Sequence, residues 1–218
     1  MDGPDTEDSG RPVLRRTLLR VSDLEIRPLT PTRLHDLAEL FGQGGDPRWC
    51  WCASFRLRSA DFRRDPETNR KVLENALSTV ATEQRAPGLI AYRREGAVGW
   101  TSLGPRSDYV RLDHSRILAP VDDKDVWSIV CFVVSRHARG EGVAKALLDG
   151  AIAYAGEHGA LCLEGYPIEN EGRRIPAANT YMGTLAMFES AGFEVVERRR
   201  ATPNTIVRPI VRKYLRSA

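Results

Sequence analysis

The feature that most constrains the fold is an almost unbroken apolar run, VWSIVCFVVS at residues 126–135, which leads directly into RHARGEG at 136–142. A run that is apolar at nearly every position is typical of a central strand covered on both faces. Residues 141–157 carry apolar side chains at helical spacing, so a helix is expected directly after it. Two glycines at such a corner leave backbone N–H groups unobstructed at the positive end of the helix dipole. The corner therefore predicts a site for a phosphate group.

The rest of the chain alternates between strand-like and helix-like patterns. Strands are expected at 23–30, 88–93, 97–104, 126–135, 160–167, 193–199 and 208–215. Helices are expected at 31–41, from Pro66 to Val80, at 141–157, and over a segment marked by Tyr181, Leu185 and Phe188. The stretches 42–56 and 105–124 are interpreted as loops. This order predicts an α/β fold in which helices cover the faces of a mixed sheet.

Length and composition narrow the classes of protein to consider. At 218 residues the chain is expected to form a single domain, with residues 1–22 as a disordered lead. The formal net charge of +3 comes without the long basic blocks of a nucleic-acid-binding tail, so no nucleic-acid partner is expected. No apolar stretch reaches the roughly 20 residues that a bilayer requires, and the polar N-terminus does not resemble a signal peptide. The expectation is a soluble, cytoplasmic protein without a membrane partner, whose four cysteines fit no disulfide framework.

Three phosphate-binding patterns can be compared with the corner. The P-loop pattern G-x-x-x-x-G-K-[ST] fails, because Lys145 lies between two alanines. The dinucleotide pattern G-x-G-x-x-G matches Gly140 and Gly142 but meets Lys145 at its third glycine; with Glu164 near its acidic position, a dinucleotide-dependent oxidoreductase stays an alternative. The pattern [QR]-x-x-G-x-[GA] fits Arg139–Ala144 in full. Together with AVGWTSLG in the predicted hairpin and LAMFESAGFEVV near the C-terminus, it makes the chain resemble the GNAT superfamily of acyl-CoA-dependent N-acetyltransferases.

The resemblance implies one N-acetyltransferase domain at residues 23–217. Its fold would be a mixed, mostly antiparallel sheet with helices on both faces and a splayed central strand pair. Acetyl-CoA would be the cosubstrate, with its pantetheine along the main chain of the central strand and its pyrophosphate on the amides of the corner. An acceptor amine would attack the thioester directly. The implied acetyl-CoA-binding residues are Phe132, Val133, Val134, Arg139, Gly140, Glu141, Gly142, Val143, Ala144 and Lys145.

Three residues are candidates for the proton transfers. Glu164, on the strand expected to splay from the central one, is the candidate general base, with a structural ion pair as the alternative. Ser128 occupies a position where some family members carry a glutamate, and its hydroxyl could order a water. Phe188 stands where many members carry a tyrosine acid, so Tyr181, expected two turns earlier on the same helix, is the candidate helper or CoA contact, with packing as the alternative. These departures keep a catalytically silent acyl-CoA-binding protein as a second interpretation.

The stretch WCWCASFR at residues 49–56 lies where the family covers the acceptor. Trp49, Trp51 and Phe55 are therefore predicted to wall the acceptor pocket with Arg56 as an anion handle, and a buried aromatic cluster is the alternative. Cys50 and Cys52 have no second cysteine pair or histidine pair nearby, so no metal is expected. The expected acceptor is a primary amine of a small molecule or peptide. A homodimer through exposed edges of the two closing strands is a further expectation.

Overall fold

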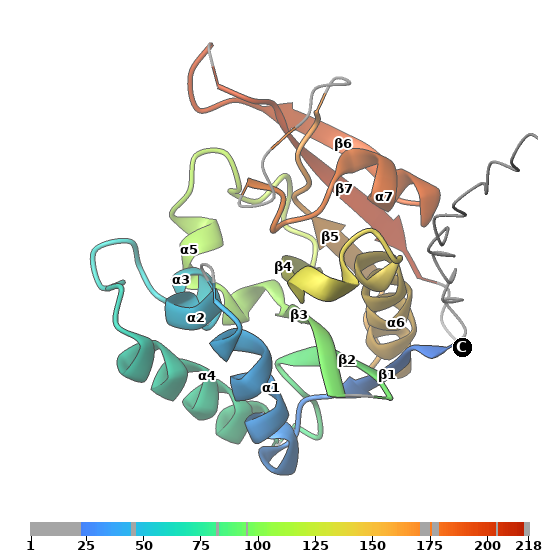
Figure 1. Cartoon of the computed structure of the whole chain (residues 1–218). Helices are drawn as coiled ribbons and strands as arrows, with labels where there is room; N and C mark the ends of the chain where they lie inside the picture. Colours follow the sequence, from blue (N-terminus) through green and yellow to red (C-terminus); the bar gives the residue numbers. More distant parts are fainter. Residues whose placement is uncertain are drawn as a thin grey trace, which may run out of the picture.

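A single seven-stranded sheet organises the described part of the chain (Figure 1). The computed structural model describes residues 23–44, 47–81, 83–94, 96–170, 175, 179–203 and 205–215, so the predicted lead at 1–22 lies outside the described residues. The strand order is β1-β2-β3-β4-β5-β7-β6. The strands are β1 (Glu25–Pro28), β2 (Gly88–Arg93), β3 (Gly96–Pro105), β4 (Trp127–Val134), β5 (Cys162–Gly165), β6 (Glu194–Arg199) and β7 (Arg208–Tyr214).

The centre of the sheet holds its parallel strand pair, β4 and β5. All the other neighbouring strands run antiparallel. The pairing of β4 with β5 extends only from Trp127↔Leu163 to Ile129↔Gly165, whereas β4 continues to Val134. The two strands therefore separate beyond Ile129, and one edge of β4 is left without a strand partner there. The predicted mixed, mostly antiparallel sheet with a splayed central pair is confirmed.

Helices cover both faces of this sheet. They are α1 (Leu34–Gly42), α2 (Pro47–Cys50), α3 (Ala53–Arg56), α4 (Pro66–Ala81), α5 (Val110–Asp113), α6 (Val143–Glu157) and α7 (Leu185–Ser190). Side chains alternate between the two faces of a strand, so Ile90 and Val130 join the core under α1 and α4, while Leu89 and Ile129 join the core under α6 and α7. None of the described helices is long and apolar enough to cross a membrane.

Helix α6 approaches β3 closely because Gly99 has no side chain. A Cβ atom at Gly99 would lie 2.6 Å from Cγ1 of Val143 and 3.0 Å from Cδ1 of Leu147. Both of these side chains are buried on the first turns of α6. The contact therefore fixes the N-terminus of α6 against the centre of the sheet.

Several short elements differ from the sequence-based expectation. Both predicted loops contain helical turns, α2 and α3 in one and α5 in the other. Trp51 and Cys52, with φ of 48° and 54°, separate α2 from α3 because left-handed backbone ends a right-handed helix. The prediction that Tyr181 lies on the last helix was wrong: α7 begins at Leu185, with Thr184 as its N-cap. The expectation that both closing strands have exposed edges was wrong for β7, which lies in the interior of the sheet between β5 and β6.

Candidate active site

A cavity of about 960 Å³ opens where β4 leaves β5. Its walls come from the end of β4, the corner before α6, helices α2 and α3, the residue Arg111 on α5, and the segment from Thr180 to Met187. Segments that are distant in the sequence therefore line one cavity. Its three regions are a basic corner, a strand edge and an aromatic end.

The basic corner joins β4 to α6. Gly140 and Gly142 have φ of 78° and 81°, a conformation that side chains disfavour, and Gly142 is the N-cap of α6. The first intrahelical bond runs from the N–H of Ala146 to the carbonyl of Gly142, so the amides of the preceding turn have no acceptor within the helix. Arg136, Arg139 and Lys145 line the same region. The corner is therefore built to hold an anion.

Glu141 is the one residue of the predicted acetyl-CoA set that does not line the cavity. Its carboxylate pairs with Arg93 at the end of β2. The other nine residues of the set, from Phe132 to Lys145, all line the cavity. Because the ion pair with Arg93 turns the negative charge of Glu141 away, the corner keeps its positive potential.

The strand edge is formed by the part of β4 that β5 does not cover. The N–H of Ser135 donates to the carbonyl of Val98 in β3, whereas the N–H of Phe132 faces the opposite way and donates to the carbonyl of Tyr181. Alternation along a strand therefore points the N–H of Val134 toward the cavity as well. The chain itself thus uses the Phe132 amide, and the Val134 amide is the one at the open edge.

The aromatic end of the cavity is lined by Trp49, Phe55, Phe62 and Tyr181. Trp49 and Phe62 lie with ring centroids 5.9 Å apart, and Phe55 and Tyr181 with centroids 6.3 Å apart. The buried Asn69 of α4 secures this end, because its amide donates to the backbone carbonyl of Trp49 at 2.7 Å and to that of Arg63 at 2.7 Å.

Two of the four residues predicted to contact the acceptor lie behind this wall. Trp51 is buried against Phe41, with ring centroids 5.0 Å apart, and does not line the cavity. Arg56 also lies outside the lining; its guanidinium is 3.8 Å from Asp108 and stacks over Tyr109. The charged residue that lines the cavity at its aromatic end is Arg111, in the predicted loop 105–124.

Tyr181 lies on the approach to α7, and 41 % of its surface is exposed. Burial of the hydroxyl raises the pKa of Tyr181, and the nearby Arg208 and Arg111 offset part of that rise. The hydroxyl is therefore protonated at neutral pH and can donate a proton. Phe188 is fully buried and packs on Gly165, where a Cβ atom would lie 2.4 Å from its ring. It does not line the cavity.

Glu164 and Ser128 lie opposite each other on β5 and β4 at the closed end of the splay. Glu164 is fully buried and accepts hydrogen bonds from Arg106 at 2.9 Å, from Arg212 at 2.8 Å and from the Tyr166 hydroxyl at 2.7 Å. The Ser128 hydroxyl lies 2.8 Å from that of Tyr166. Neither Glu164 nor Ser128 lines the cavity. Both carboxylate oxygens of Glu164 are engaged by these donors. This arrangement supports the structural ion pair, which is the alternative to a role as general base.

A family model described as the Acetyltransferase (GNAT) family matches residues 49–171, which is more than half of the chain. The chain belongs to the GNAT acetyltransferase family. It is therefore an enzyme of the N-acetyltransferase type that takes its acetyl group from an acyl-CoA. A search of curated proteins found no match.

Solved structures share the fold of this GNAT acetyltransferase at low sequence identity. One is a GCN5-related N-acetyltransferase from Kribbella flavida, with 19% identity, a TM-score of 0.52, and coverage of 89% of this chain and 99% of that one. The ribosomal-protein-alanine N-acetyltransferase from Brucella melitensis has 20% identity, a TM-score of 0.52 and coverage of 88% and 99%. An acetyltransferase from Salmonella typhimurium, solved with acetyl-CoA, has 14% identity, a TM-score of 0.53 and coverage of 90% and 96%.

The residues of the corner fit the acetyl-CoA that the GNAT family uses. The amides at the start of α6 and the three cations suit the two negative charges of a pyrophosphate. A Cβ atom at Gly140 would meet nothing within 4 Å, so that glycine is required by its positive φ and not by crowding.

The cysteines of this acetyltransferase are all free thiols. Cys50, Cys52 and Cys131 line the cavity, and the Trp100 indole N–H donates to the Cys52 sulfur at 3.3 Å. Burial raises the pKa of the Cys50 thiol. The part of the chain that the structure describes contains no group of three His, Cys, Asp or Glu side chains placed to hold a metal.

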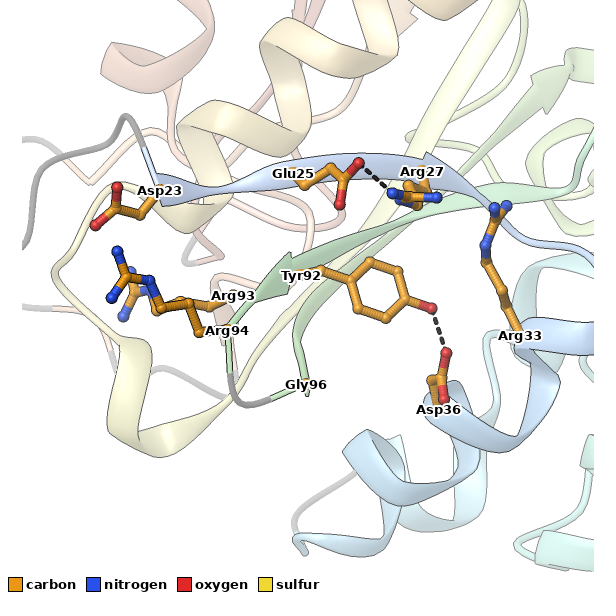
Figure 2. Close-up of a pocket in the computed structure, with 9 residues that line it drawn as sticks. All are labelled: Asp23, Glu25, Arg27, Arg33, Asp36, Tyr92, Arg93, Arg94 and Gly96. Atoms are coloured by element: carbon orange, nitrogen blue, oxygen red, sulfur yellow. Dashed lines mark hydrogen bonds and ion pairs between the residues drawn. The ribbon is translucent and has the colours of Figure 1, made fainter.

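A second cavity, of about 540 Å³, lies between β1, β2 and the start of α1 (Figure 2). In Figure 2, Tyr92 points across it to Asp36, 2.5 Å from hydroxyl to carboxylate, and Glu25 pairs with Arg27. The acidic and basic side chains that line it therefore neutralise one another in part. It includes none of the predicted site residues.

Proposed function

We propose that this acetyltransferase transfers the acetyl group of acetyl-CoA to a primary amine of a small molecule or peptide, by direct attack in the large cavity. The observation that carries the proposal is continuity: one cavity joins an anion-binding corner, an open strand edge and an aromatic end. Pyrophosphate, pantetheine and acceptor would occupy these regions in that order. The amine forms a bond to the thioester carbon, the carbon–sulfur bond breaks, and CoA leaves as a thiolate.

Backbone amides and one side-chain hydroxyl of the protein would serve the parts of this reaction. The amides of Val143, Ala144 and Lys145 would bind the pyrophosphate, and the open edge at Val134 would bind the pantetheine as an added strand does. The Tyr181 hydroxyl is the proton donor available to the leaving thiolate, because it lines the cavity and is protonated at neutral pH. A thiol with an ordinary pKa of about 8.5 can also leave without such help.

For Glu164 we propose a structural role in place of a catalytic one. Its two oxygens accept from arginines on both sides, Arg106 after β3 and Arg212 on β7, so one carboxylate connects three parts of the sheet. This cross-link would fix the point from which β4 and β5 diverge. Ser128 would add a hydroxyl to the same network through Tyr166. The domain limits at 23–217, the homodimer and the cytoplasmic location remain predictions.

Release of the CoA thiol separates catalysis from silent binding. The purified chain would be mixed with acetyl-CoA and each member of a panel of amines, and free thiol would be followed against a blank without amine. The proposal predicts amine-dependent thiol release with at least one amine. Binding of acetyl-CoA without release above the blank for any amine would favour the silent interpretation.

A further inference from the structure

The side chains that line the aromatic end of the cavity indicate what kind of acceptor it binds. This inference rests on the proposed function. The three aromatic rings of Trp49, Phe55 and Phe62 come from α2, α3 and the segment that follows, so three separate pieces of backbone converge on this end. Such walls bind a flat, apolar group by stacking and burial. A slender, strongly hydrated aliphatic amine would leave much of this surface unused.

The charged residues of the cavity are all cations. Among the described residues that line it there is no aspartate, glutamate or histidine. Arg136, Arg139 and Lys145 belong to the corner, which leaves Arg111 as the charged residue that lines the aromatic end; Arg64, outside the lining, lies over the Trp49 ring at 4.6 Å from its centroid. An alkylammonium ion would meet a positive potential there, with no carboxylate to stabilise it or take its proton.

Arg111 is half-buried and has no carboxylate partner among the described residues. Arg33 and Arg208, which lie outside the lining of the large cavity, also lack one, but they donate to backbone carbonyls at 2.8 Å and 3.1 Å. Arg85, Arg106 and Arg212 each form ion pairs within the protein. Arg111 forms no ion pair with any described residue, and its hydrogen bond to the Ser54 carbonyl is long, at 3.4 Å. It belongs to the lining and lies near Tyr181, whose pKa it lowers against the larger rise caused by burial. A partly buried cation without a counter-charge favours an anionic ligand.

We propose that the acceptor is an arylamine that carries a carboxylate: the carboxylate pairs with Arg111, the ring stacks between the aromatic walls, and the uncharged amino group faces the thioester. An arylamine is neutral at physiological pH, so it needs no base before it attacks. When its nitrogen bonds to the acetyl carbon, the one proton that the nitrogen loses balances the one that the CoA thiolate gains. An alkylammonium ion would have to release a further proton, and the described lining offers no acceptor for it.

Four amines test the ring-bound amine and the carboxylate separately. 4-Aminobenzoate has both features, aniline lacks the carboxylate, 4-(aminomethyl)benzoate has a carboxylate with an alkylammonium, and benzylamine has neither. At pH 7.5 we expect kcat/KM for 4-aminobenzoate to exceed that for each of the other three by about 10-fold or more. If 4-(aminomethyl)benzoate or benzylamine reacts as fast as 4-aminobenzoate, or if none of the four reacts while acetyl-CoA binds, the inference is overturned. A failure of acetyl-CoA to bind would instead overturn the proposed function.

Variants of Arg111 assign the carboxylate preference to one side chain. In R111M, the ratio of kcat/KM for 4-aminobenzoate to that for aniline should fall by about 10- to 100-fold, since a charge-assisted hydrogen bond is lost. R111K should restore part of the ratio, because it keeps the charge without the forked donors. The matched control is R58M, at an exposed arginine outside the cavity lining. Thermal unfolding of R111M checks that the variant folds, and an unchanged ratio in folded R111M would contradict the role of Arg111.

Discussion

At the scale of single residues, Glu164 carries a buried negative charge whose partners come from two other strands or their ends. Removing the charge would leave Arg212, itself nearly buried, with Asp122 as its remaining ion pair. E164Q should lower the free energy of unfolding by about 3 kcal/mol, measured by urea denaturation, because a buried pair is broken from one side. Turnover per folded molecule should stay near that of the wild type.

The control for this prediction is E189Q, on the exposed face of α7. A general base would behave in the opposite way, with unchanged stability and a loss of kcat of about 100-fold or more. That result would restore the catalytic role that the sequence predicted for Glu164.

Tyr181 offers a second test at this scale. Y181F should keep the KM for acetyl-CoA and lower kcat by about 10-fold, because the hydroxyl assists a thiolate that can also leave unaided. Steady-state kinetics at saturating acetyl-CoA provide the measurement. Unchanged kcat and KM would assign Tyr181 to packing against Phe55, the alternative that its ring contact supports.

The buried Tyr109 should make the free energy of unfolding depend on pH in the alkaline range. Burial raises the pKa of Tyr109 to about 12, from an ordinary value near 10. The folded state therefore holds a proton that the unfolded state has lost, so stability is complete below about pH 10 and falls as pH rises toward 12. Over this pH range, Tyr109 alone should lower the free energy of unfolding by about 3 kcal/mol. Y109F should show a shallower decline in unfolding free energy between pH 9 and pH 11; equal slopes would show that Tyr109 does not contribute.

At the scale of elements, the N-terminus of α6 owes its position to Gly99. G99A would place a methyl group 2.6 Å from Val143, which should cost about 1–3 kcal/mol of stability by overpacking and weaken acetyl-CoA binding as α6 shifts. V143A removes the contacting methyl group, so the double variant G99A/V143A should be more stable than the sum of the single effects predicts. Additive effects in urea denaturation would contradict this contact.

The sequence predicted long elements well and short ones poorly. Helix α6 and strand β4 have apolar patterns long enough to be unambiguous. Helices α2, α3 and α5 have four residues each, too few to show a period, and they are fixed by packing of distant segments. The start of α7 did carry a local signal in the sequence, the pair Gly183-Thr184. In the structure Gly183 has φ of 84°, and the Thr184 side chain caps the helix by accepting from the Met187 N–H.

At the scale of the whole molecule, the set of residues proposed to bind acetyl-CoA could be identified from the sequence because it is local, and nine of its ten residues line the cavity. The aromatic end could be predicted only in part, because Arg111 and Phe62 reach it only through the tertiary fold. The same holds for Arg212, whose register opposite Glu164 depends on β7 entering between β5 and β6. An apolar strand that contains a glutamate does, however, imply a buried cation nearby.

The central claim, that the corner before α6 binds acetyl-CoA, is tested most directly by thermal unfolding with acetyl-CoA, CoA or NAD. A ligand at 100 times its Kd stabilises the fold by about 2.7 kcal/mol, which for a chain of this size raises Tm by about 5–10 °C. We predict that shift for acetyl-CoA and CoA but not for NAD, its loss in R139E/K145E, and its retention in R94E, where an exposed arginine outside the large cavity is changed. An equal shift in R139E/K145E, or no shift with either CoA species, would contradict the claim.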